Sequence, residues 1–201
     1  MQALNGLIAE AKNVVFDVGN VLLTFDPDRF LAKLLPPERA ARLNAHLICT
    51  PVWSRLDEGT VGEDEVAHYS ARMAGDESLW PDVMVFIRRF PDCMERLPAC
   101  RLIPCLHDMG KRVYILSNYG VDTFARTERR FADVFAQVDG MVISGREKLL
   151  KPDPRIYHCL LDRYGLKAEE SVFIDDTPRN IDGARAVGMR GIVYTGAHVL
   201  D

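Results

Sequence analysis

Strand-sized apolar runs separated by helical patterns constrain the fold of this chain more than any other feature. The runs are rich in β-branched residues and nearly continuous, which is typical of parallel strands covered on both faces. From residue 110 onward they alternate with helical patterns, which favours an open α/β sheet with right-handed crossovers. The sequence therefore predicts a doubly wound, Rossmann-like parallel sheet with strands at residues 13–18, 112–118, 141–144, 171–176 and 191–195.

The interval between the first two predicted strands breaks this alternation. It exceeds ninety residues, far more than one crossover helix needs, and prolines and glycines divide it into helical patterns. These patterns lie at residues 27–35, 37–49, 62–74, 80–89 and 98–109. Because the last one leads into the second strand, it belongs with the sheet. We therefore predict a discontinuous core at residues 1–25 and 91–201, with an inserted α-helical cap at residues 26–90.

Helix boundary signals support two of the later helices. Asp153 is placed to cap a helix that Gly165 ends, with a proline at the first helical position. Thr177 is placed in the same way before a second helix, which Gly188 follows. Both predicted helices flank the fourth strand, as crossover helices should.

Length and charge narrow the classes of function. The chain has 201 residues, enough for one core and a small accessory domain, and its net charge of -4 gives no reason to expect binding to nucleic acid or an anionic membrane. No apolar run has the length of a membrane span, and the N-terminus lacks the pattern of a signal peptide. The cysteines are odd in number and without Cys-x-x-Cys spacing, which predicts reduced, mostly buried thiols in a cytoplasmic protein. They are Cys49, Cys93, Cys100, Cys105 and Cys159.

Polar residues end three of the predicted strands. Asp17 ends the first, Ser117 and Asn118 end the second, and Asp175 and Asp176 end the fourth. Each acid alone fits a turn or a helix cap. Parallel strands, however, bring their carboxyl ends to one edge of the sheet, where ligands bind. Carboxylates gathered there repel each other without a cation and suit a hard one, most naturally Mg²⁺.

A lysine completes this set. Lys151 lies between the third and fourth strands, and the sequence Lys-Pro-Asp-Pro fixes the chain that follows it. An isolated lysine in a loop is usually exposed. Together with an acid, a hydroxyl and an acid pair, in that order, it predicts a phosphate site with a metal ion.

Four motifs in this chain resemble those of the haloacid dehalogenase (HAD) superfamily, in its phosphatase branch. They are FDVGNVL, LSN, KPDPRIY and FIDDTPRNIDGARAVGM, and their order and spacing fit the family. The helical insertion after the first motif is similar to the helical cap of this family. The first motif resembles most the FDLGNV or FDLGGV group, which includes bacterial α-D-glucose-1-phosphate phosphatases. The segment WSRLDEGTVGEDEVAHY, residues 53–69, also resembles the cap of that group.

The resemblance implies roles for the predicted phosphate-binding residues. Asp17 would be the catalytic nucleophile and form an aspartyl-phosphate that water hydrolyses. Ser117 and the amide of Asn118 would hold the phosphoryl oxygens, and Lys151 would neutralise both the phosphate and Asp17. The implied substrate is a small phosphorylated metabolite, with a sugar phosphate favoured.

The resemblance also implies a magnesium site. Its ligands would be Asp17, the backbone carbonyl of Gly19 and Asp176, with Asp175 close by or bridging through water. Most of the rate would come from positioning and from neutralising charge around the transferred group.

Gly19 departs from the family pattern. Most phosphatases of the family carry there a second aspartate, which acts as general acid and base and is typically worth a factor of about 10²–10⁴ in rate. Three interpretations remain open. The enzyme favours good leaving groups such as an anomeric oxygen, an acid near Asp57 and Glu58 in the cap substitutes, or the domain binds phosphoryl ligands without catalysis. Asn20, next in the chain, suits a left-handed turn.

Two other functions compete with a phosphatase. A metal-independent 2-haloacid dehalogenase also lacks the second aspartate, but it has no need of the pair Asp175–Asp176. A phosphoacceptor signalling domain of the receiver type carries its acid pair near the N-terminus and has no cap. Four residues of the predicted cap are candidates to face the substrate, although each fits the cap core or the surface equally well. They are Trp53, Arg55, Glu58 and Trp80.

Overall fold

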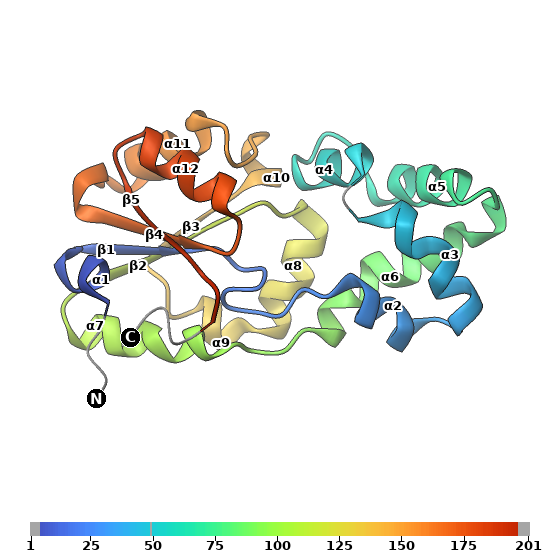
Figure 1. The fold of residues 1–201 in the computed structure, drawn as a ribbon, viewed down its shortest axis with the longest axis horizontal. Helices are drawn as coiled ribbons and strands as arrows, with labels where there is room; N and C mark the ends of the chain where they lie inside the picture. Colours follow the sequence, from blue (N-terminus) through green and yellow to red (C-terminus); the bar gives the residue numbers. More distant parts are fainter. Residues whose placement is uncertain (1–4, 49, 197–201) are drawn as a thin grey trace.

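The computed structural model describes residues 5–48 and 50–196, and its centre is a five-stranded parallel sheet (Figure 1). The strand order is β3-β2-β1-β4-β5, so β1 lies in the middle, and Val14 pairs with Val113 on one side and Val172 on the other. All five predicted strands are confirmed to within two residues at either end. They are β1 (Asn13–Phe16), β2 (Arg112–Ser117), β3 (Gly140–Ile143), β4 (Ser171–Asp175) and β5 (Arg190–Val193).

Helices cover both faces of the sheet, which explains why the strands are apolar without alternation. On one face Val15 and Phe173 pack with α11 (Pro154–Tyr164) and α12 (Pro178–Ala186). On the other face Val14 and Phe16 join the main hydrophobic cluster. The helices of that second side are α1 (Gly6–Glu10), α7 (Leu102–Asp108), α8 (Val121–Arg130) and α9 (Ala132–Phe135).

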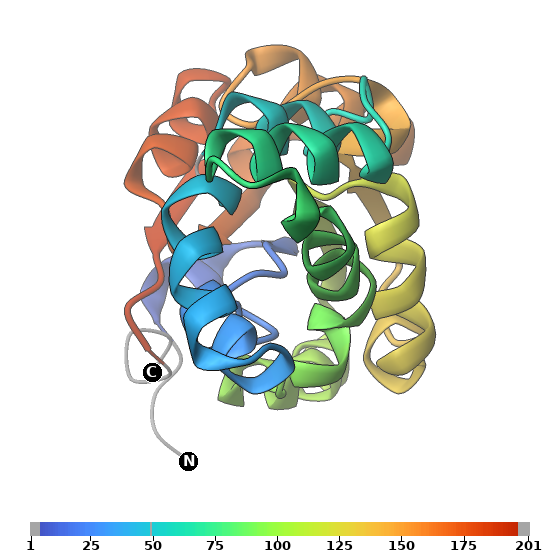
Figure 2. The ribbon, with the colours of Figure 1, turned by 90° about the vertical axis from the view of Figure 1, so that its right-hand side faces the viewer.

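Five helices between β1 and β2 extend the molecule at one end of the sheet, and Figure 2 views them from that end. They are α2 (Pro27–Leu34), α3 (Pro37–Leu47), α4 (Pro51–Asp57), α5 (Glu63–Met73) and α6 (Trp80–Cys93). The helical insertion is thus present, and α4 is an addition to the predicted helices. The predicted boundary between cap and core, after residue 90, falls inside α6. The division into a core at 1–25 and 91–201 and a cap at 26–90 stays a prediction.

The residues that the sequence predicts at the ends of two later helices lie at the ends of α11 and α12. Asp153 Oδ1 accepts a hydrogen bond of 2.9 Å from the backbone N–H of Arg155, and Gly165 has φ +60° after α11. Thr177 occupies the N-cap position of α12, but its side chain makes no capping hydrogen bond and its hydroxyl donates to Asp176 instead. The predicted helix at 98–109 is a 3-10 turn followed by α7. The remaining short elements are α10 (Ser144–Glu147) and the 3-10 turns Glu77–Leu79, Pro98–Arg101 and Ala168–Glu170.

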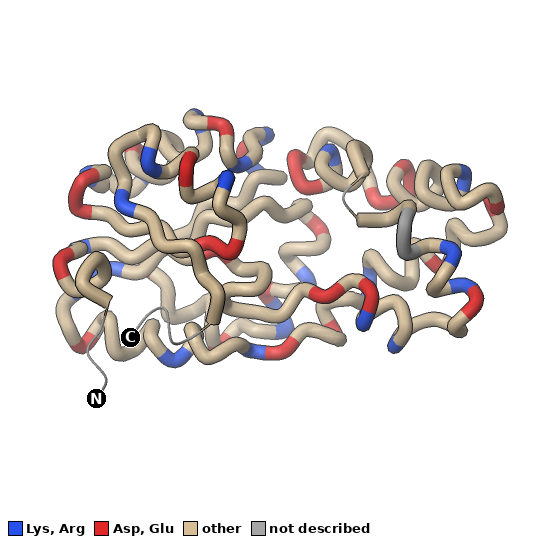
Figure 3. Tube along the Cα trace, in the orientation of Figure 1, with Lys and Arg blue, Asp and Glu red and all other residues tan. Residues whose placement is uncertain are grey.

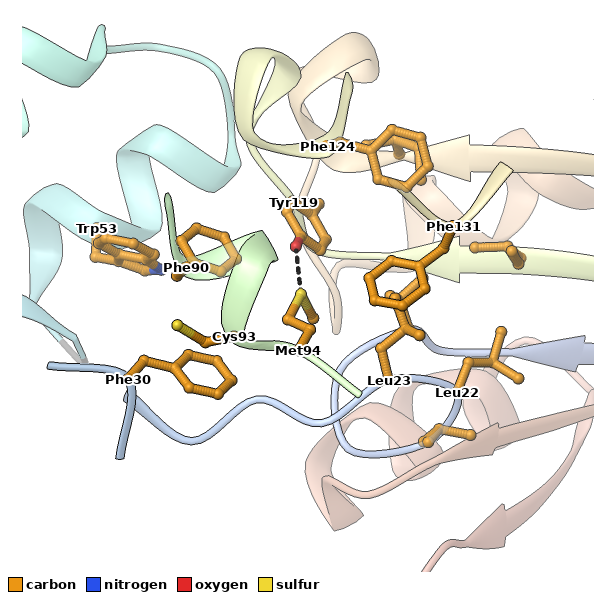
Figure 4. Close-up of a cluster of buried hydrophobic side chains, with 14 of the residues drawn as sticks. Leu22, Leu23, Phe30, Trp53, Phe90, Cys93, Met94, Tyr119, Phe124 and Phe131 are labelled. Carbon is orange, nitrogen blue, oxygen red and sulfur yellow. Dashed lines mark hydrogen bonds between the residues drawn. The ribbon is translucent and has the colours of Figure 1, made fainter. Parts of the chain in front are cut away.

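One hydrophobic cluster joins the inserted helices to the sheet side of the molecule (Figure 4). Trp53 and Phe90 come from the inserted helices, and their ring centroids lie 6.4 Å apart. Phe90 stacks on Tyr119, which follows β2, at 6.2 Å. The Tyr119 hydroxyl contacts Met94 Sδ at 3.6 Å (Figure 4). The inserted helices are therefore packed on the rest of the chain through aromatic side chains.

Charged residues of both signs are interspersed along the described chain (Figure 3). Many pair at the surface, for example Arg96 with Asp133 at 2.7 Å. Buried charges are the informative exception, because leaving water is costly for an ion without a partner. Among the described residues they are Asp17, Lys111, Lys151 and Asp175.

The thiols are less buried than predicted. Cys93 is buried, Cys100 and Cys159 are half-buried, and Cys105 is exposed, so the expectation of mostly buried thiols is wrong for the described part of the chain. These four cysteines are free, and Cys49 lies outside the described residues. In the described ranges, no helix combines the length and the apolar character that crossing a bilayer requires.

Candidate active site

Three of the predicted site residues meet where neighbouring strands end. Asp17 directly follows β1, and its backbone N–H donates to the Ile174 carbonyl at 2.9 Å, which continues the pairing with β4. Ser117 and Asp175 are the last residues of β2 and β4. Because β1 lies between these two strands, side chains far apart in the sequence gather around Asp17.

Lys151 forms ion pairs with two of the acids, Asp17 and Asp175. Its Nζ atom is 2.9 Å from Asp17 Oδ1 and 2.6 Å from Asp175 Oδ2, and its side chain is fully buried. Burial by itself would lower the pKa of this lysine, but the two carboxylates outweigh it and raise the pKa. Lys151 is therefore a fixed positive charge next to the predicted nucleophile.

Asn118 fixes the backbone that carries Lys151. Its side-chain Oδ1 accepts from the Lys151 N–H at 2.8 Å, and its Nδ2 donates to the Lys151 carbonyl at 3.1 Å. The loop after β3 is thereby clamped to the end of β2. The hydroxyl of Ser117, one residue earlier, hydrogen-bonds the carboxylate of Asp17.

The two acids of the pair at the end of β4 have different surroundings. Asp175 accepts from the Thr177 N–H at 2.8 Å and from Asn180 Nδ2 at 3.0 Å, besides its contact with Lys151. Both of its oxygens are thus engaged within the protein. Asp176 is half-buried, borders the cavity beside Asp17 and accepts from Asn20 Nδ2 at 3.3 Å.

The acids at this edge form a donor set that fits a hard divalent cation. One carboxylate oxygen each from Asp17, Asp175 and Asp176 lies within 4.8 Å of the others. Burial raises the pKa of Asp17 to about 6; Lys151 opposes this shift and Asp175 adds to it. Asp17 Oδ1 is buried, and apart from the ion pair with Lys151 it accepts no well-aligned hydrogen bond from the described residues. A cation with oxygen ligands, such as Mg²⁺, suits these groups.

Gly19 borders the same cavity, and nothing in its surroundings demands a glycine. A Cβ atom there would meet only Phe25 Cβ, at an ordinary 3.8 Å, and the backbone of Gly19 lies outside the left-handed region. Asn20 is the left-handed residue of this turn, with φ 54°, as its sequence position predicts. Its Oδ1 accepts from the Phe25 N–H at 2.9 Å and closes the turn.

The cavity above Asp17 has a volume of about 210 Å³ and two kinds of wall. The polar wall includes Ser117, Asn118 and Asp176 from the strand ends. The apolar part of the lining, apart from Trp53, had no signal in the sequence, because buried apolar residues usually belong to the hydrophobic core. It consists of Phe25, Trp53, Phe90, Met94 and Tyr119.

Of the four cap candidates, the structure places Trp53 in the cavity wall. Trp80 is 38% exposed and stacks on His68 with ring centroids 5.1 Å apart. Arg55 pairs with Glu65 at 3.4 Å on the surface, and Glu58 accepts from the Thr60 hydroxyl at 3.2 Å. Asp57, next to Glu58, borders the cavity that contains Asp17.

Comparison with known proteins agrees with the motifs. The sequence profile of haloacid dehalogenase-like hydrolases matches residues 11–188. The chain belongs to this family. It is 25% identical to a sesquiterpene phosphatase of Aspergillus oryzae over 189 residues, covering 92% of this chain and 90% of that protein. A phosphatase of Mycobacterium tuberculosis is 31% identical over 117 residues, 58% of this chain and about half (51%) of the relative.

Solved structures share the fold of this HAD-like hydrolase. A HAD family enzyme from Bacteroides thetaiotaomicron, crystallised with magnesium and inorganic phosphate, superposes with a TM-score of 0.70 at 18% identity, covering 93% of this chain and 96% of that one. An L-2-haloacid dehalogenase from Xanthobacter autotrophicus gives 0.66 at 21% identity, with coverage of 90% and 76%. The fold is therefore shared with a haloacid dehalogenase and with an enzyme that was crystallised with magnesium and phosphate, and the fold alone does not choose a reaction.

Proposed function

We propose that this HAD-like hydrolase is a magnesium-dependent phosphatase that acts on small phosphomonoesters through an aspartyl-phosphate intermediate. One observation carries the proposal: Asp17, which is paired with the buried Lys151, borders a cavity that Asp176 also lines. The phosphatases among its relatives support a phosphorylated substrate. A small phosphorylated metabolite of the cytoplasm is the partner that we expect.

The residues present divide the work of phosphoryl transfer between them. Asp17 attacks phosphorus, while the Lys151 ammonium offsets charge on the nucleophile and on the phosphoryl oxygens. The Ser117 hydroxyl and the Asn118 amide bind the remaining phosphoryl oxygens. Asp175 holds Lys151 in place through its 2.6 Å contact.

Magnesium, when bound, would neutralise charge on the transferred phosphoryl group. The residues that would hold it are Asp17, the Gly19 carbonyl and Asp176, with Asp175 directly or through water. The carboxylate cluster supports this choice of metal, since three acids this close repel each other without a cation.

The acid pair also separates this proposal from dehalogenation. A metal-independent dehalogenase needs a nucleophile and a cradle for the halide, but no cation site. Here Asp175 and Asp176 each place a carboxylate oxygen within 4.8 Å of one from Asp17, as a cation site requires, and burial and the neighbouring Asp175 raise the pKa of Asp176. A purely ligand-binding domain would keep this geometry, and only turnover separates the two.

Two classes of phosphomonoester, which differ in their leaving group, are candidates for the substrate. The resemblance to glucose-1-phosphate phosphatases favours a sugar phosphate. The aromatic wall of the cavity favours a second candidate, the phosphate of an apolar or aromatic alcohol, because a sugar ring needs polar partners for its hydroxyls. The side chains of Trp53 and Phe90 carry this second candidate.

A phosphatase screen tests the proposal. The panel contains glucose 1-phosphate, a nucleotide, an aryl phosphate, a prenyl phosphate and an alkyl phosphate, each with Mg²⁺ or with excess chelator, plus 2-chloropropionate as the dehalogenase substrate. We expect release of inorganic phosphate that depends on Mg²⁺. Chloride release, or phosphatase activity undiminished by chelator, would contradict the mechanism. The ranking of the sugar, aryl and prenyl phosphates decides between the two leaving groups.

A further inference from the structure

Asp57 belongs to the inserted helices and borders the same cavity as the proposed nucleophile Asp17, which follows a strand of the sheet. It is the last residue of α4, and it borders the cavity that contains Asp17 and Gly19. It also borders an adjoining opening at Lys151. No strand positions this residue, so its place depends on how α4 is attached to the rest of the molecule.

Contacts with the core fix the end of α4. The Ser144 hydroxyl donates to the Asp57 carbonyl, and the backbone N–H of Gly120 donates to the Asp57 carboxylate. Two residues further along, the Lys148 ammonium donates to the Gly59 carbonyl. Two of these contacts attach the backbone around Asp57 to the core, and the Gly120 N–H binds its carboxylate.

The approach of α4 to the core also depends on a glycine. A Cβ atom at Gly120 would lie 3.1 Å from the carbonyl oxygen of Leu56 and 2.9 Å from Thr123 Oγ1, both tight contacts. The absence of a side chain at Gly120 therefore lets its N–H reach Asp57. The position of Asp57 near the core thus depends on α4 and on the segment around Gly120.

The reaction requires a proton donor that the sheet does not supply. The leaving oxygen of an alkyl phosphate is a strong base and needs protonation as its bond to phosphorus breaks. Gly19 has no side chain to provide it. We infer that Asp57 is the general acid and base of this enzyme, supplied by the helical segment in place of the acid missing at Gly19. The inference rests on the proposed phosphatase function.

The electrostatic surroundings agree with this role. Removal of its carboxyl group from water raises the pKa of Asp57 well above its usual value; the Gly120 N–H opposes this shift, the charge of Asp17 adds to it, and Lys151 opposes it. A raised pKa keeps the acid protonated closer to neutral pH, as proton donation requires. The titratable or charged side chains around the same cavity and its adjoining opening are Asp17, Lys151, Tyr119, Asp176, Asp153 and Arg179.

Two balanced steps follow from this assignment. In the first, an Asp17 oxygen forms a bond to phosphorus, the ester P–O bond breaks with its electron pair on the leaving oxygen, and Asp57 gives that oxygen its proton. In the second, water attacks the aspartyl-phosphate and gives a proton to the Asp57 carboxylate. The P–O bond to Asp17 then breaks, which restores Asp17 and releases inorganic phosphate.

The first test compares Asp57→Asn with Glu58→Gln, its neighbour outside the cavity, on an alkyl phosphate and on 4-nitrophenyl phosphate with Mg²⁺. We expect Asp57→Asn to lower kcat/KM for the alkyl phosphate by about 10²–10⁴, and for the aryl phosphate by less than about tenfold, because a nitrophenolate leaves without a proton. Glu58→Gln should change neither. In wild type, the alkyl rate should fall as pH rises through the pKa of Asp57, and this limb should be absent in Asp57→Asn.

The second test places an acid where the family usually has one. The double variant Asp57→Asn with Gly19→Asp should recover at least about tenfold of the lost alkyl-phosphate activity, because position 19 has room for a side chain. If Asp57 only held α4 on the core, both substrates would suffer equally in Asp57→Asn and the new aspartate would restore nothing.

A third measurement needs no variant and covers the case in which Asp57→Asn does not fold. Across a leaving-group series, wild type should show a shallow dependence of kcat/KM on leaving-group basicity; a steep one would overturn the inference. Turnover that requires both Asp17 and Mg²⁺ but is retained by Asp57→Asn on alkyl phosphates would contradict the role of Asp57 and leave the proposed function intact. If wild type hydrolyses no phosphomonoester, the proposed function and this inference fail together.

Discussion

Asp17 is buried next to Lys151, and this placement makes it reactive at some expense of stability. Removing its charge from water raises its pKa to about 6, against the opposing effect of Lys151 and with a further rise from Asp175. Asp17 is therefore suited to act as a nucleophile, and its charge does not stabilise the fold.

Asp17→Asn should therefore abolish turnover without harming the fold. The amide keeps the shape of the side chain but cannot form an aspartyl-phosphate, and Lys151 keeps its 2.6 Å contact with Asp175. We expect a loss of at least about 10³ in kcat, and a free energy of unfolding at pH 7 without metal equal to that of wild type or higher, since a charge disfavoured by burial is gone. Phosphate release and denaturant unfolding measure the two effects. A variant that keeps more than a trace of activity would show that another group is the nucleophile.

The site residues that the sequence could predict are those at strand ends. Asp17, Ser117 and Asp175 lie at the ends of apolar runs that are recognisable as parallel strands. Because parallel strands end at the same edge of the sheet, these residues were expected to lie close together. Asp57 and Glu58 are adjacent acids in a stretch without strand periodicity, and the sequence does not separate them. The distinction of Asp57 from Glu58 depends on the Gly120 N–H, a contact between segments that no local pattern records.

At the scale of elements, one contact at the junction between α4 and the core is made by a buried hydroxyl. Ser144 Oγ accepts from the Tyr119 N–H at 2.7 Å and donates to the Asp57 carbonyl. In contrast, the hydroxyl of Ser70 in α5 is buried and has no hydrogen-bond partner among the described residues. The two serines are equally buried, and they differ in the hydrogen bonds that their hydroxyls make.

Replacing each serine with alanine should have opposite results. Ser144→Ala leaves a buried N–H and a carbonyl without a partner, so we expect a loss of about 1–3 kcal/mol in the free energy of unfolding, together with lower activity as α4 loosens. Ser70→Ala removes a desolvated hydroxyl from a helix and should be neutral or stabilising by up to about 1 kcal/mol. Equal losses in both variants, measured by denaturant unfolding, would refute this distinction.

Elements with strong periodicity were predictable, and those held by tertiary contacts were not. The strands were found because burial on both faces leaves continuous apolar runs. The helix α4 has seven residues, too few to show a helical period, and Pro51 in a sequence fits a boundary between helices as well as a helix start. The helix predicted at residues 80–89 also stops too early, since a proline is expected to end a helix, yet α6 continues through the buried Pro91 to Cys93.

At the scale of the whole molecule, magnesium should be linked to folding. The cluster of Asp17, Asp175 and Asp176 exists only in the folded chain, so Mg²⁺ at one hundred times its Kd should add about 2.7 kcal/mol to the free energy of unfolding. Thermal unfolding with Mg²⁺ and with chelator measures this gain. No shift in Tm at saturating Mg²⁺ would exclude a metal site at this edge.

The gain from magnesium should depend on pH. The raised pKa of Asp17 means that the folded, metal-free protein binds a proton more tightly than the unfolded chain, so its stability falls as pH rises from about 4 to about 6. Below about pH 6 magnesium must displace this proton, and its Kd should rise by up to tenfold per pH unit. Titration calorimetry at pH 5 and pH 7.5 compares the two conditions. An affinity independent of pH would place the ion away from Asp17.

The aromatic cluster between the inserted helices and the sheet side carries its own spectroscopic probe. The chain has two tryptophans, and only Trp53 lies in the cavity wall, 8% exposed, while Trp80 is 38% exposed on the surface. In Trp80→Phe, all tryptophan emission therefore reports on the contact of Trp53 with Phe86 and Phe90. A substrate that occupies the cavity would contact Trp53 and change the polarity around its indole, so binding should shift the emission of this tryptophan. Stopped-flow fluorescence would then time the entry of the substrate, independently of the chemistry that follows.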